Sequence, residues 1–489
     1  MELNATIYYQ AMLSHDARFD GKFFGAVTTT GIYCRPVCRV SPPRFENVQW
    51  FMCAAAAEAA GFRPCRRCRP ESAPGTPAWL GSSAIVSRAL RLISEGMLDE
   101  ISLEDFADKL GIGTRHLRRL FAEHLGVSPV AMAAARRVHF AARLIEETQL
   151  PVTEIAFAAG FSSIRQFNLA VRSAFGQSPT EIRNRLGLKT SLKRNQESAN
   201  GALQLRLPYR PPLDWIAMSG FLAGRTIPGL EQVDGNFYRR TININEQTGV
   251  IELQHVPDES HLLLRVWLPS YENAMKVVER ARRIFDLSAD PLQINEHLRR
   301  DPLLTEAIEK TPGLRVPGAW DGFELAVRAV LGQQISVSAA RTLASRFAAA
   351  FGSAIDSPFA TLTTIFPAPE KIADLDASEL TKLGILPKRT QTILALATAL
   401  ANCELVLTPG VDVLATIDKL KTITGIGEWT AQYIAMRALT WPDAFPHTDL
   451  GVMKALGEKN PKRILQIGEA WQPWRAYAVM HLWTKGEAK

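Results

Sequence analysis

Two glycines, Gly425 and Gly427, flank the single apolar residue Ile426 between two apolar stretches of helical period. This pattern predicts a helix, a tight hairpin and a second helix, because glycine permits the positive φ of such a turn and lets another group approach the backbone. The second helix would begin at the hairpin, where its unpaired N–H groups and positive dipole end suit an anion. An ordinary helix cap is the simpler alternative.

The length and composition indicate a multidomain protein. The chain has 489 residues, of which 47% are hydrophobic and 21% charged, enough for several packed cores. No apolar run approaches the roughly 20 residues of a membrane span, and the N-terminus lacks a signal-peptide pattern. We therefore expect a cytoplasmic protein whose six cysteines are reduced or bind metal rather than forming a disulfide framework.

The net charge of +7 is unevenly distributed along the chain. Residues 1–200 contain 25 Lys plus Arg and 18 Asp plus Glu, whereas the remainder contains 31 of each class. The basic excess predicts that the N-terminal half binds a polyanion. The C-terminal half would have to hold a nucleic acid by local geometry.

Four cysteines lie close together in the sequence as a CxxxC pair and a CxxC pair, namely Cys34, Cys38, Cys65 and Cys68. Two such pairs predict a closed tetrahedral zinc site. Neighbouring arginines would favour the thiolate form and could also meet phosphate. These arginines are Arg35, Arg39, Arg63, Arg66, Arg67 and Arg69. A purely structural zinc site is the alternative to a reactive one.

The segment Phe23 to Glu71 resembles the N-terminal domain of the Ada methylation-response proteins, through Thr29 to Cys38, Glu46 to Val48 and Ala60 to Cys68. In that family the first cysteine of the CRPxC motif accepts a methyl group from a DNA phosphotriester. The resemblance therefore implies that Cys34 is a sacrificial nucleophile, which zinc would keep as a thiolate.

Two similar helical blocks follow, and each predicts a helix-turn-helix. In the first block Gly111 makes the turn and Thr114 is the expected N-cap; in the second, Gly160 makes the turn and Ser163 is the N-cap. The second helix of each block carries side-chain types that contact bases or phosphates. These are Arg115, Arg118 and Arg119 in one block and Arg165, Gln166 and Arg172 in the other. Residues 85–185 resemble the AraC-type regulator domain.

Beyond a polar linker the sequence changes character. Alternating or β-branched patterns predict strands at 203–207, 237–244, 249–255 and 262–268 and thus a small antiparallel sheet. From Tyr271 onward the pattern is helical almost to the end.

This last part of the chain, nearly all of its final 290 residues, resembles the alkylated-base DNA glycosylase AlkA of the helix-hairpin-helix superfamily. Five blocks occur in the family's order. They are 211–215 with 220–223, 285–287, 328–337, 425–431, and 473–478 with 481–483.

The catalytic acid of that family matches Asp449. Breaking the bond between a purine and its sugar creates an oxocarbenium-like centre, and a carboxylate can stabilise it or activate water against it. The alternative role for Asp449 is the N-cap of a helix that begins at Leu450.

Trp429 stands where relatives that also cut the DNA backbone have a Schiff-base lysine, so we expect hydrolysis without strand cleavage. The resemblance also implies an aromatic pocket for a flipped cationic base, formed by Phe221, Trp429, Tyr433 and Trp483. Four aromatic residues in a protein core are the alternative.

The resemblance further implies that Gly425, Gly427 and Thr430 contact DNA and that a monovalent cation is held by backbone carbonyls at the hairpin. The residue that fills the gap left by the flipped base matches Gln334, where the family has leucine. This departure leaves Ile335 as the other candidate.

We therefore predict a mainly α multidomain protein that joins an Ada-type methyl-acceptor, an AraC-type activator and a glycosylase for alkylated purines such as 3-methyladenine. The predicted parts are a four-cysteine zinc α+β domain (1–78), a double helix-turn-helix (79–187), a linker (188–202), a β-containing subdomain (203–310) and an all-α helix-hairpin-helix domain (311–489). The alternative is a regulator or damage sensor with a non-catalytic glycosylase-like half. Expected partners are alkylated and promoter double-stranded DNA and RNA polymerase, for a monomeric bacterial protein near the nucleoid and away from membranes.

Overall fold

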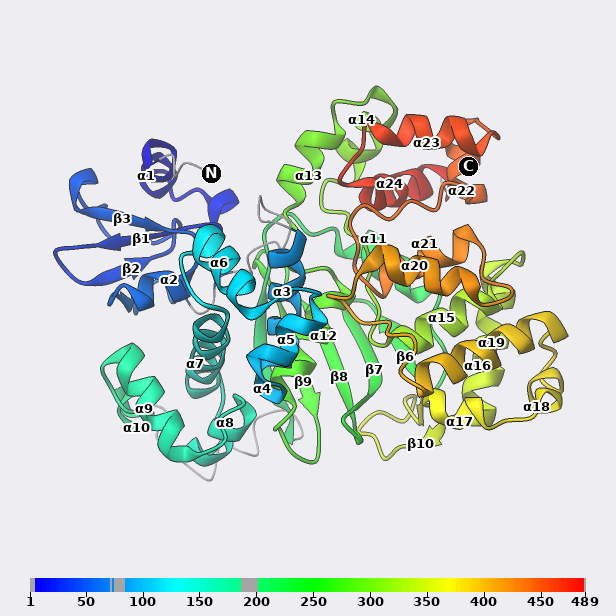
Figure 1. Ribbon diagram of the computed structural model, residues 1–489, viewed down its shortest axis with the longest axis horizontal. Helices are drawn as coiled ribbons and strands as arrows, with labels where there is room; N and C mark the ends of the chain where they lie inside the picture. The colour runs from blue at the N-terminus through cyan, green and yellow to red at the C-terminus, as the bar shows by residue number, and fades with distance from the viewer. Residues whose placement is uncertain (1–4, 71–72, 74–83, 186–200, 488–489) are drawn as a thin grey trace. The chain divides into compact units, whose positions relative to one another are not determined.

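The computed structural model describes residues 5–70, 73, 84–185 and 201–487 (Figure 1). The chain forms two compact units, one of residues 1–210 and 260–279 and the other of residues 211–259 and 280–489. Part of the predicted β-containing subdomain thus groups with the first unit. The predicted linker 188–202 lies outside the described residues except for 201–202.

The N-terminal part of the first unit is built around a small sheet with strand order β3-β1-β2-β4. β1 pairs antiparallel with β2 and β3, while β4 pairs parallel with β2. β2 ends at Cys34 and β4 leads directly to Cys65, so the sheet brings the two cysteine pairs together. The elements are α1 (Ala5–Leu13), β1 (Phe24–Val27), β2 (Ile32–Cys34), β3 (Val48–Phe51), α2 (Ala54–Ala59) and β4 (Arg63–Pro64), with short 3-10 turns at Ala17–Phe19 and Phe45–Asn47.

The helices that follow contain both predicted helix-turn-helix blocks. They are α3 (Ala84–Ser94), α4 (Met97–Glu100), α5 (Leu103–Lys109), α6 (Thr114–Leu125), α7 (Pro129–Glu147), α8 (Val152–Ala158), α9 (Ile164–Phe175) and α10 (Pro179–Arg185). Ser163 caps α9 as predicted, since its side chain accepts a hydrogen bond from the Gln166 amide. The prediction for Thr114 is wrong: Gly113 is the N-cap of α6, and Thr114 is already helical.

One hydrophobic core is shared by the zinc-domain helix and the first helix-turn-helix. Cys53, Ala55 and Ala56, at the start of α2, pack in the same cluster as Phe106 and Leu117. The predicted boundary at residue 78 therefore does not separate two independent cores. Two further strands of this unit, β5 (Leu203–Pro208) and β9 (His261–Trp267), pair antiparallel, and α12 (Ala274–Ile284) follows them.

The second unit begins with α11 (Trp215–Ala223) and three antiparallel strands, β6 (Glu231–Asp234), β7 (Phe237–Ile244) and β8 (Gln247–His255). The sequence predicted β7 and β8 but missed β6, which is short and mostly polar. The helices are α13 (Pro291–Leu298), α14 (Pro302–Lys310), α15 (Gly322–Leu331), α16 (Val337–Phe351), α17 (Pro369–Ala373), α18 (Ala377–Thr381), α19 (Pro387–Ala401), α20 (Val413–Thr422), α21 (Glu428–Arg437), α22 (Leu450–Leu456), α23 (Pro461–Glu469) and α24 (Arg475–Glu487). Two-residue strands β10 (Ser353–Ala354) and β11 (Thr364–Ile365) pair between α16 and α17.

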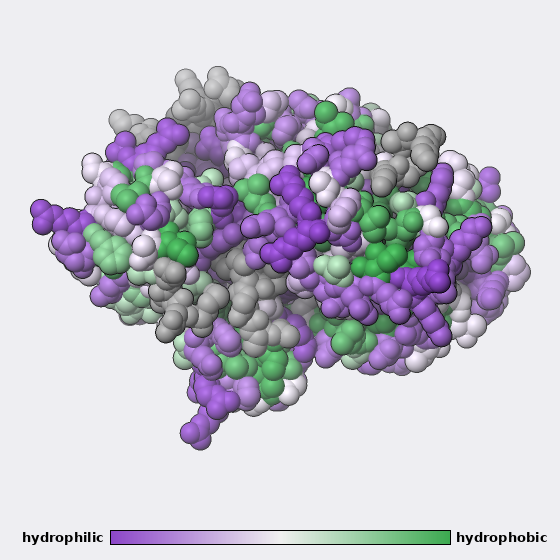
Figure 2. Space-filling view, turned by 90° about the horizontal axis from the view of Figure 1, so that it is seen from above, coloured by the Kyte–Doolittle hydropathy of each residue, from purple (hydrophilic) through white to green (hydrophobic). Residues whose placement is uncertain are grey.

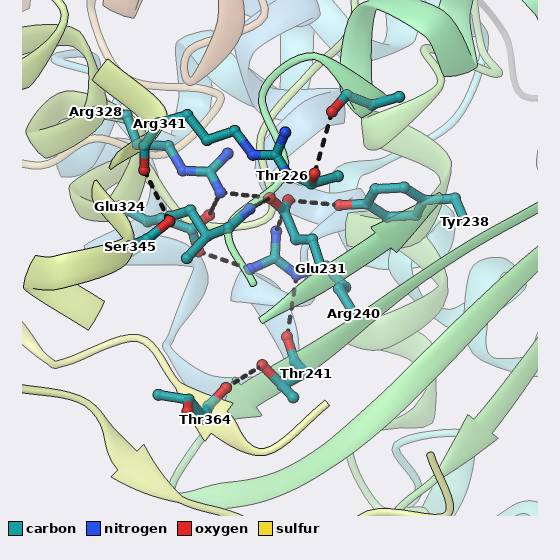
Figure 3. A network of polar contacts seen from close by, with 12 residues as sticks. Thr226, Glu231, Tyr238, Arg240, Thr241, Glu324, Arg328, Arg341, Ser345 and Thr364 are labelled. Atoms are coloured by element: carbon teal, nitrogen blue, oxygen red, sulfur yellow. Dashed lines mark hydrogen bonds and ion pairs between the residues drawn. The ribbon is translucent and has the colours of Figure 1, made fainter. Parts of the chain in front are cut away.

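A buried ion network joins β6 and β7 to α15 (Figure 3). Arg240 binds Glu324 at 2.6 Å and lies 3.5 Å from Glu231, and Arg328 also binds Glu231. Tyr238 donates its hydroxyl hydrogen to Glu231 at 2.8 Å. Burial opposes charge on Glu231, but the positive charges of Arg328 and Arg240 outweigh it and hold the pKa of this carboxyl at about 2.

The surface is polar with scattered apolar side chains. Hydrophilic residues predominate on the face seen in Figure 2, with smaller apolar patches between them. Within the described parts of the chain, no helix has the length and apolar character to cross a bilayer.

Candidate active site and zinc centre

The predicted helix-hairpin-helix is formed by α20 and α21. Gly425 has φ +95°, and a Cβ there would lie 2.0 Å from the Thr392 hydroxyl oxygen, so only glycine fits. Gly427 has an ordinary φ of −93° and open space around it. Gly427 is the N-cap of α21 without a side-chain cap, which leaves the first N–H groups of the helix facing outward. The two glycines thus differ: one makes the turn and the other gives access to the helix end.

The hairpin is held by Gln333, two residues after the end of α15, a residue that the sequence did not single out. The Gln333 side-chain amide donates to the Gly425 carbonyl and to the Thr430 hydroxyl, both at 2.9 Å. Thr430 is only 2% exposed, although it is among the residues that line the cavity containing Asp449. The DNA contact by Thr430 stays a prediction.

Asp449 is the N-cap of α22 and also lines the large cavity of this half of the protein. Its Oδ1 accepts hydrogen bonds from the Val452 amide at 3.0 Å and from the Trp483 indole at 2.9 Å. Its Oδ2 accepts from the Trp429 indole at 2.7 Å. The N-cap alternative is thus correct for the position of Asp449, but it does not exclude a chemical role. Three donors fix the orientation of the half-buried carboxylate.

Close packing next to Asp449 depends on a glycine that sequence analysis missed. A Cβ on Gly451 would lie 2.9 Å from Asp449 Oδ1 and 3.0 Å from Trp483 Cδ1. Real Cβ contacts are not this short, so a side chain at Gly451 would displace the carboxylate or the indole.

All four predicted pocket aromatics line one cavity of about 1210 Å³, together with Asp449. Trp429 and Tyr433 stack with ring centroids 5.2 Å apart, and Phe221 lies parallel to Trp483 at 6.2 Å. Each of the four side chains is half-buried rather than enclosed. Residues from α11, α21 and α24 therefore meet around one acid.

Two arginines at this cavity were not anticipated. The Arg225 guanidinium lies 3.7 Å from the centre of the Phe221 ring, and that of Arg437 lies 5.0 Å from it. Arg437 Nη1 also donates to the Tyr433 hydroxyl oxygen at 2.7 Å. Burial would raise the pKa of Tyr433, but the charges of Arg437 and Arg225 more than compensate, and the net effect is a lowered pKa.

Both candidates for the residue that fills the gap lie at the cavity. Gln334 is exposed in a left-handed conformation with φ +55°, and Ile335 is 36% exposed. Arg389 donates to the Gln333 carbonyl and so fixes the backbone just before them. Gln334 stays the predicted gap-filling residue, with Ile335 as the alternative.

The predicted base- and phosphate-contacting residues of the first unit are exposed on α6 and α9. They are Arg115, Arg118 and Arg119 on α6 and Arg165, Gln166 and Arg172 on α9. None of these arginines has a carboxylate partner within the described residues. The α6 and α9 faces are thus free to bind a polyanion.

The four cysteine sulfurs lie within 4.8 Å of one another, the arrangement that a single tetrahedral metal ion requires. Three of these cysteines are buried and Cys68 is half-buried. The expected arginine field is weaker than predicted, because Arg35 pairs with Asp20 and Arg69 with Glu146. Arg35 also donates to the Cys68 carbonyl at 2.9 Å and so braces the site.

Four family profiles match successive parts of the chain. They are the metal binding domain of Ada (7–71), a helix-turn-helix domain (106–185), the AlkA N-terminal domain (204–321) and the HhH-GPD superfamily of base excision DNA repair proteins (327–461). The chain is therefore a helix-hairpin-helix DNA repair protein joined to an Ada-type domain that binds zinc through its four cysteines and to a DNA-binding helix-turn-helix domain.

A curated relative extends this likeness over nearly the whole chain. The probable bifunctional transcriptional activator/DNA repair enzyme AlkA of Mycobacterium tuberculosis is 44% identical over 480 residues, which are 97% of this chain and 95% of the relative. The chain belongs to this family of bifunctional activator and repair proteins.

Two further comparisons concern the C-terminal half. DNA-3-methyladenine glycosylase 2 of Escherichia coli is 36% identical over 279 residues, 57% of this chain and 95% of that protein. The structure of a 3-methyladenine DNA glycosylase from Archaeoglobus fulgidus shares the fold, with a TM-score of 0.50 at 19% identity over 58% of this chain and 98% of that one.

Proposed function

We propose that the C-terminal half hydrolyses the N-glycosidic bond of alkylated purines such as 3-methyladenine in double-stranded DNA, with Asp449 as the catalytic acid residue. The observation that carries this proposal is the Asp449 carboxylate, held by two indole N–H groups inside an aromatic cavity beside the hairpin. Such preorganisation suits a reaction in which positive charge develops on the sugar.

The damaged base would leave the duplex and enter the cavity. Asp449 would then face the anomeric carbon and stabilise the oxocarbenium-like centre or activate water. Trp429 has no amine, so no Schiff base forms there and the DNA backbone stays intact. Within the cavity, the Phe221, Trp429, Tyr433 and Trp483 rings are the proposed base-contacting surfaces.

DNA would be held at the hairpin by the backbone N–H groups that follow Gly425 and Gly427. Gln334 or Ile335 would fill the gap that the flipped base leaves. The carbonyl groups of the hairpin are the proposed ligands of a monovalent cation.

In the N-terminal part, we propose that Cys34 accepts a methyl group from a DNA methylphosphotriester, with zinc supplying a deprotonated sulfur at neutral pH. The α6 and α9 faces would then bind promoter DNA and activate transcription through RNA polymerase. The proposed form is a monomer associated with the nucleoid.

The test is release of 3-methyladenine from methylated duplex DNA by the full chain, without strand breaks. Asp449→Asn should abolish release and keep DNA binding, because the amide retains the size but not the charge of the carboxylate. Asp376→Asn is the matched control, since Asp376 caps α18 and lies outside the cavity. Unchanged release by Asp449→Asn would refute the proposed role. Promoter occupancy that rises on Cys34 methylation, with no base release by the wild type, would instead favour a sensor.

A further inference from the structure

The side chain of Arg437 is a buried cation whose hydrogen-bond partners are all neutral groups. It is 4% exposed and donates to the carbonyls of Pro317 and Gly318 at 2.8 and 3.2 Å and to the Tyr433 hydroxyl. Within the described residues no carboxylate pairs with it. Glu231 and Glu324 line a small internal cavity with Arg437, but neither is bonded to it. A buried cation without a directly bonded carboxylate is unfavourable, so its place beside the cavity of Asp449 indicates a functional role.

The contact between Arg437 and Tyr433 fixes the direction of the phenolic proton. A guanidinium has no acceptor, so in this contact the Tyr433 oxygen must accept and its own O–H group is left to donate elsewhere. The described residues provide no acceptor for that proton. Tyr433 and Arg437 both line the cavity that contains Asp449. The cavity therefore contains a hydrogen-bond donor in addition to its carboxylate.

The leaving base decides whether such a donor matters. A purine methylated on N3 or N7 is cationic in DNA and leaves as a neutral molecule. A neutral modified purine would leave as an anion unless a proton reaches it, and general acid catalysis meets that need. The positive charges of Arg437 and Arg225 beside the phenol favour loss of its proton and lower the pKa of Tyr433.

We propose that Tyr433 donates its phenolic proton to the flipped base, with Arg437 stabilising the phenolate, and that this step promotes release of neutral modified purines. This inference rests on the proposed glycosylase function. The bond between C1′ and the base nitrogen breaks with its electron pair going to the base, which takes the Tyr433 proton. Water adds to C1′ and gives a proton to Asp449, and solvent then returns that proton to Tyr433.

The test is single-turnover base release from duplexes that contain one 7-methylguanine, which is cationic, or one hypoxanthine, which is neutral. Tyr433→Phe removes only the hydroxyl group, so both rates fall through weaker base contacts but the neutral base suffers more. The ratio of the neutral to the cationic rate should drop by roughly 10²-fold, the lower range for general acid catalysis.

Tyr477→Phe is the matched control, because its hydroxyl donates to Asp286 at 2.6 Å and Tyr477 does not line the cavity. It should leave the ratio unchanged, and circular dichroism should show that both variants are folded. Equal losses on both bases in Tyr433→Phe would overturn the inference and leave Tyr433 as a stacking residue only. Wild-type release of 7-methylguanine but not hypoxanthine would also overturn it. Wild-type failure to release 3-methyladenine from methylated duplex DNA would instead refute the proposed glycosylase function.

Discussion

Two aromatic residues of the cavity, Trp429 and Trp483, also position Asp449, because their indole N–H groups donate hydrogen bonds to its carboxylate. Trp483→Phe keeps an aromatic ring and removes one donor to the carboxylate. We expect single-turnover base release to slow by roughly 10- to 100-fold, because a hydrogen bond to a charged group contributes about 1.5–3 kcal/mol. The assay is base release at saturating enzyme.

Trp471 provides a matched control for this prediction. Its indole also donates to a carboxylate, Asp301, at 2.7 Å, but Trp471 does not line the cavity. Trp471→Phe should reduce stability without a comparable loss of rate. If Trp483→Phe slowed release no more than Trp471→Phe does, the Trp483 indole would have no special role in positioning Asp449.

The buried imidazole of His481 makes the stability of the fold sensitive to acid. Its Nδ1 donates to the Thr311 hydroxyl oxygen, since that hydroxyl donates to the Ala307 carbonyl. Burial lowers the pKa of His481 from 6.5 to about 4, so the neutral ring is the folded form. As the pH falls from 6.5 to about 4, the unfolded state binds a proton first and stability is lost.

The expected loss is about 3 kcal/mol across this window, because one pKa unit corresponds to about 1.4 kcal/mol. Urea unfolding of the wild type and of His481→Gln between pH 7 and pH 4 measures it. The glutamine variant should lose less stability on acidification. Equal acid sensitivity of the two proteins would contradict this account of His481.

At the scale of elements, the ion network of Figure 3 ties β6 and β7 to α15, the helix that precedes Gln333 and its contacts with the hairpin. Glu231→Gln removes a charge that Arg240 and Arg328 both face. We expect the free energy of unfolding to fall by about 3–5 kcal/mol, as when one partner of a buried ion pair is removed. Chemical denaturation measures the change.

Glu306→Gln is the control for that prediction. Glu306 pairs with Lys310 on the surface, where both side chains are about 70% exposed. Such pairs contribute about 0–1 kcal/mol, so this variant should unfold almost as the wild type does. Similar small effects in both variants would show that the buried network does not hold β6 and β7 to α15.

Local sequence patterns predicted most of the helices and strands. They failed where a feature depends on contacts between residues that are far apart in the sequence. The Gly425 turn, the Ser163 cap and strands β7 and β8 follow from local residue types and periodicity. Thr114 was misplaced by one residue, because Gly113 is also able to begin the helix. Nothing in the sequence around Thr430 reveals that its hydroxyl oxygen accepts a hydrogen bond from the Gln333 amide.

The same limit applies to the site. Motif resemblance brought Asp449 and the four aromatic residues together correctly, and the structure places all of them around one cavity. The charges in that cavity were missed, because nothing in the sequence around Arg225, just after α11, or Arg437, at the end of α21, marks either residue as part of a site. Arg225 reaches the Phe221 ring from four residues further along the chain, whereas Arg437 of α21 reaches it only through the tertiary fold.

At the scale of the molecule, the zinc centre and the first helix-turn-helix belong to one folded body. Side chains of α2 and of α5 and α6 pack in one core, which contains Cys53, Phe106 and Leu117. A chemical change at Cys34 would therefore occur in the same unit as Arg115 and Arg118, the predicted DNA-contacting residues of α6. The basic excess of the first 200 residues fits a DNA-binding role for this N-terminal unit.

The most direct test of the central claim is one incubation of the zinc-loaded full chain with duplex DNA that carries both methylated bases and methylphosphotriesters. Released bases are identified by chromatography, and the protein is digested for mass spectrometry. The account predicts free 3-methyladenine and the mass of one added methyl group on the peptide with Cys34, with Asp449→Asn losing only the first product. Base release that persists in Asp449→Asn, or a Cys34 peptide that stays unmethylated, would contradict it.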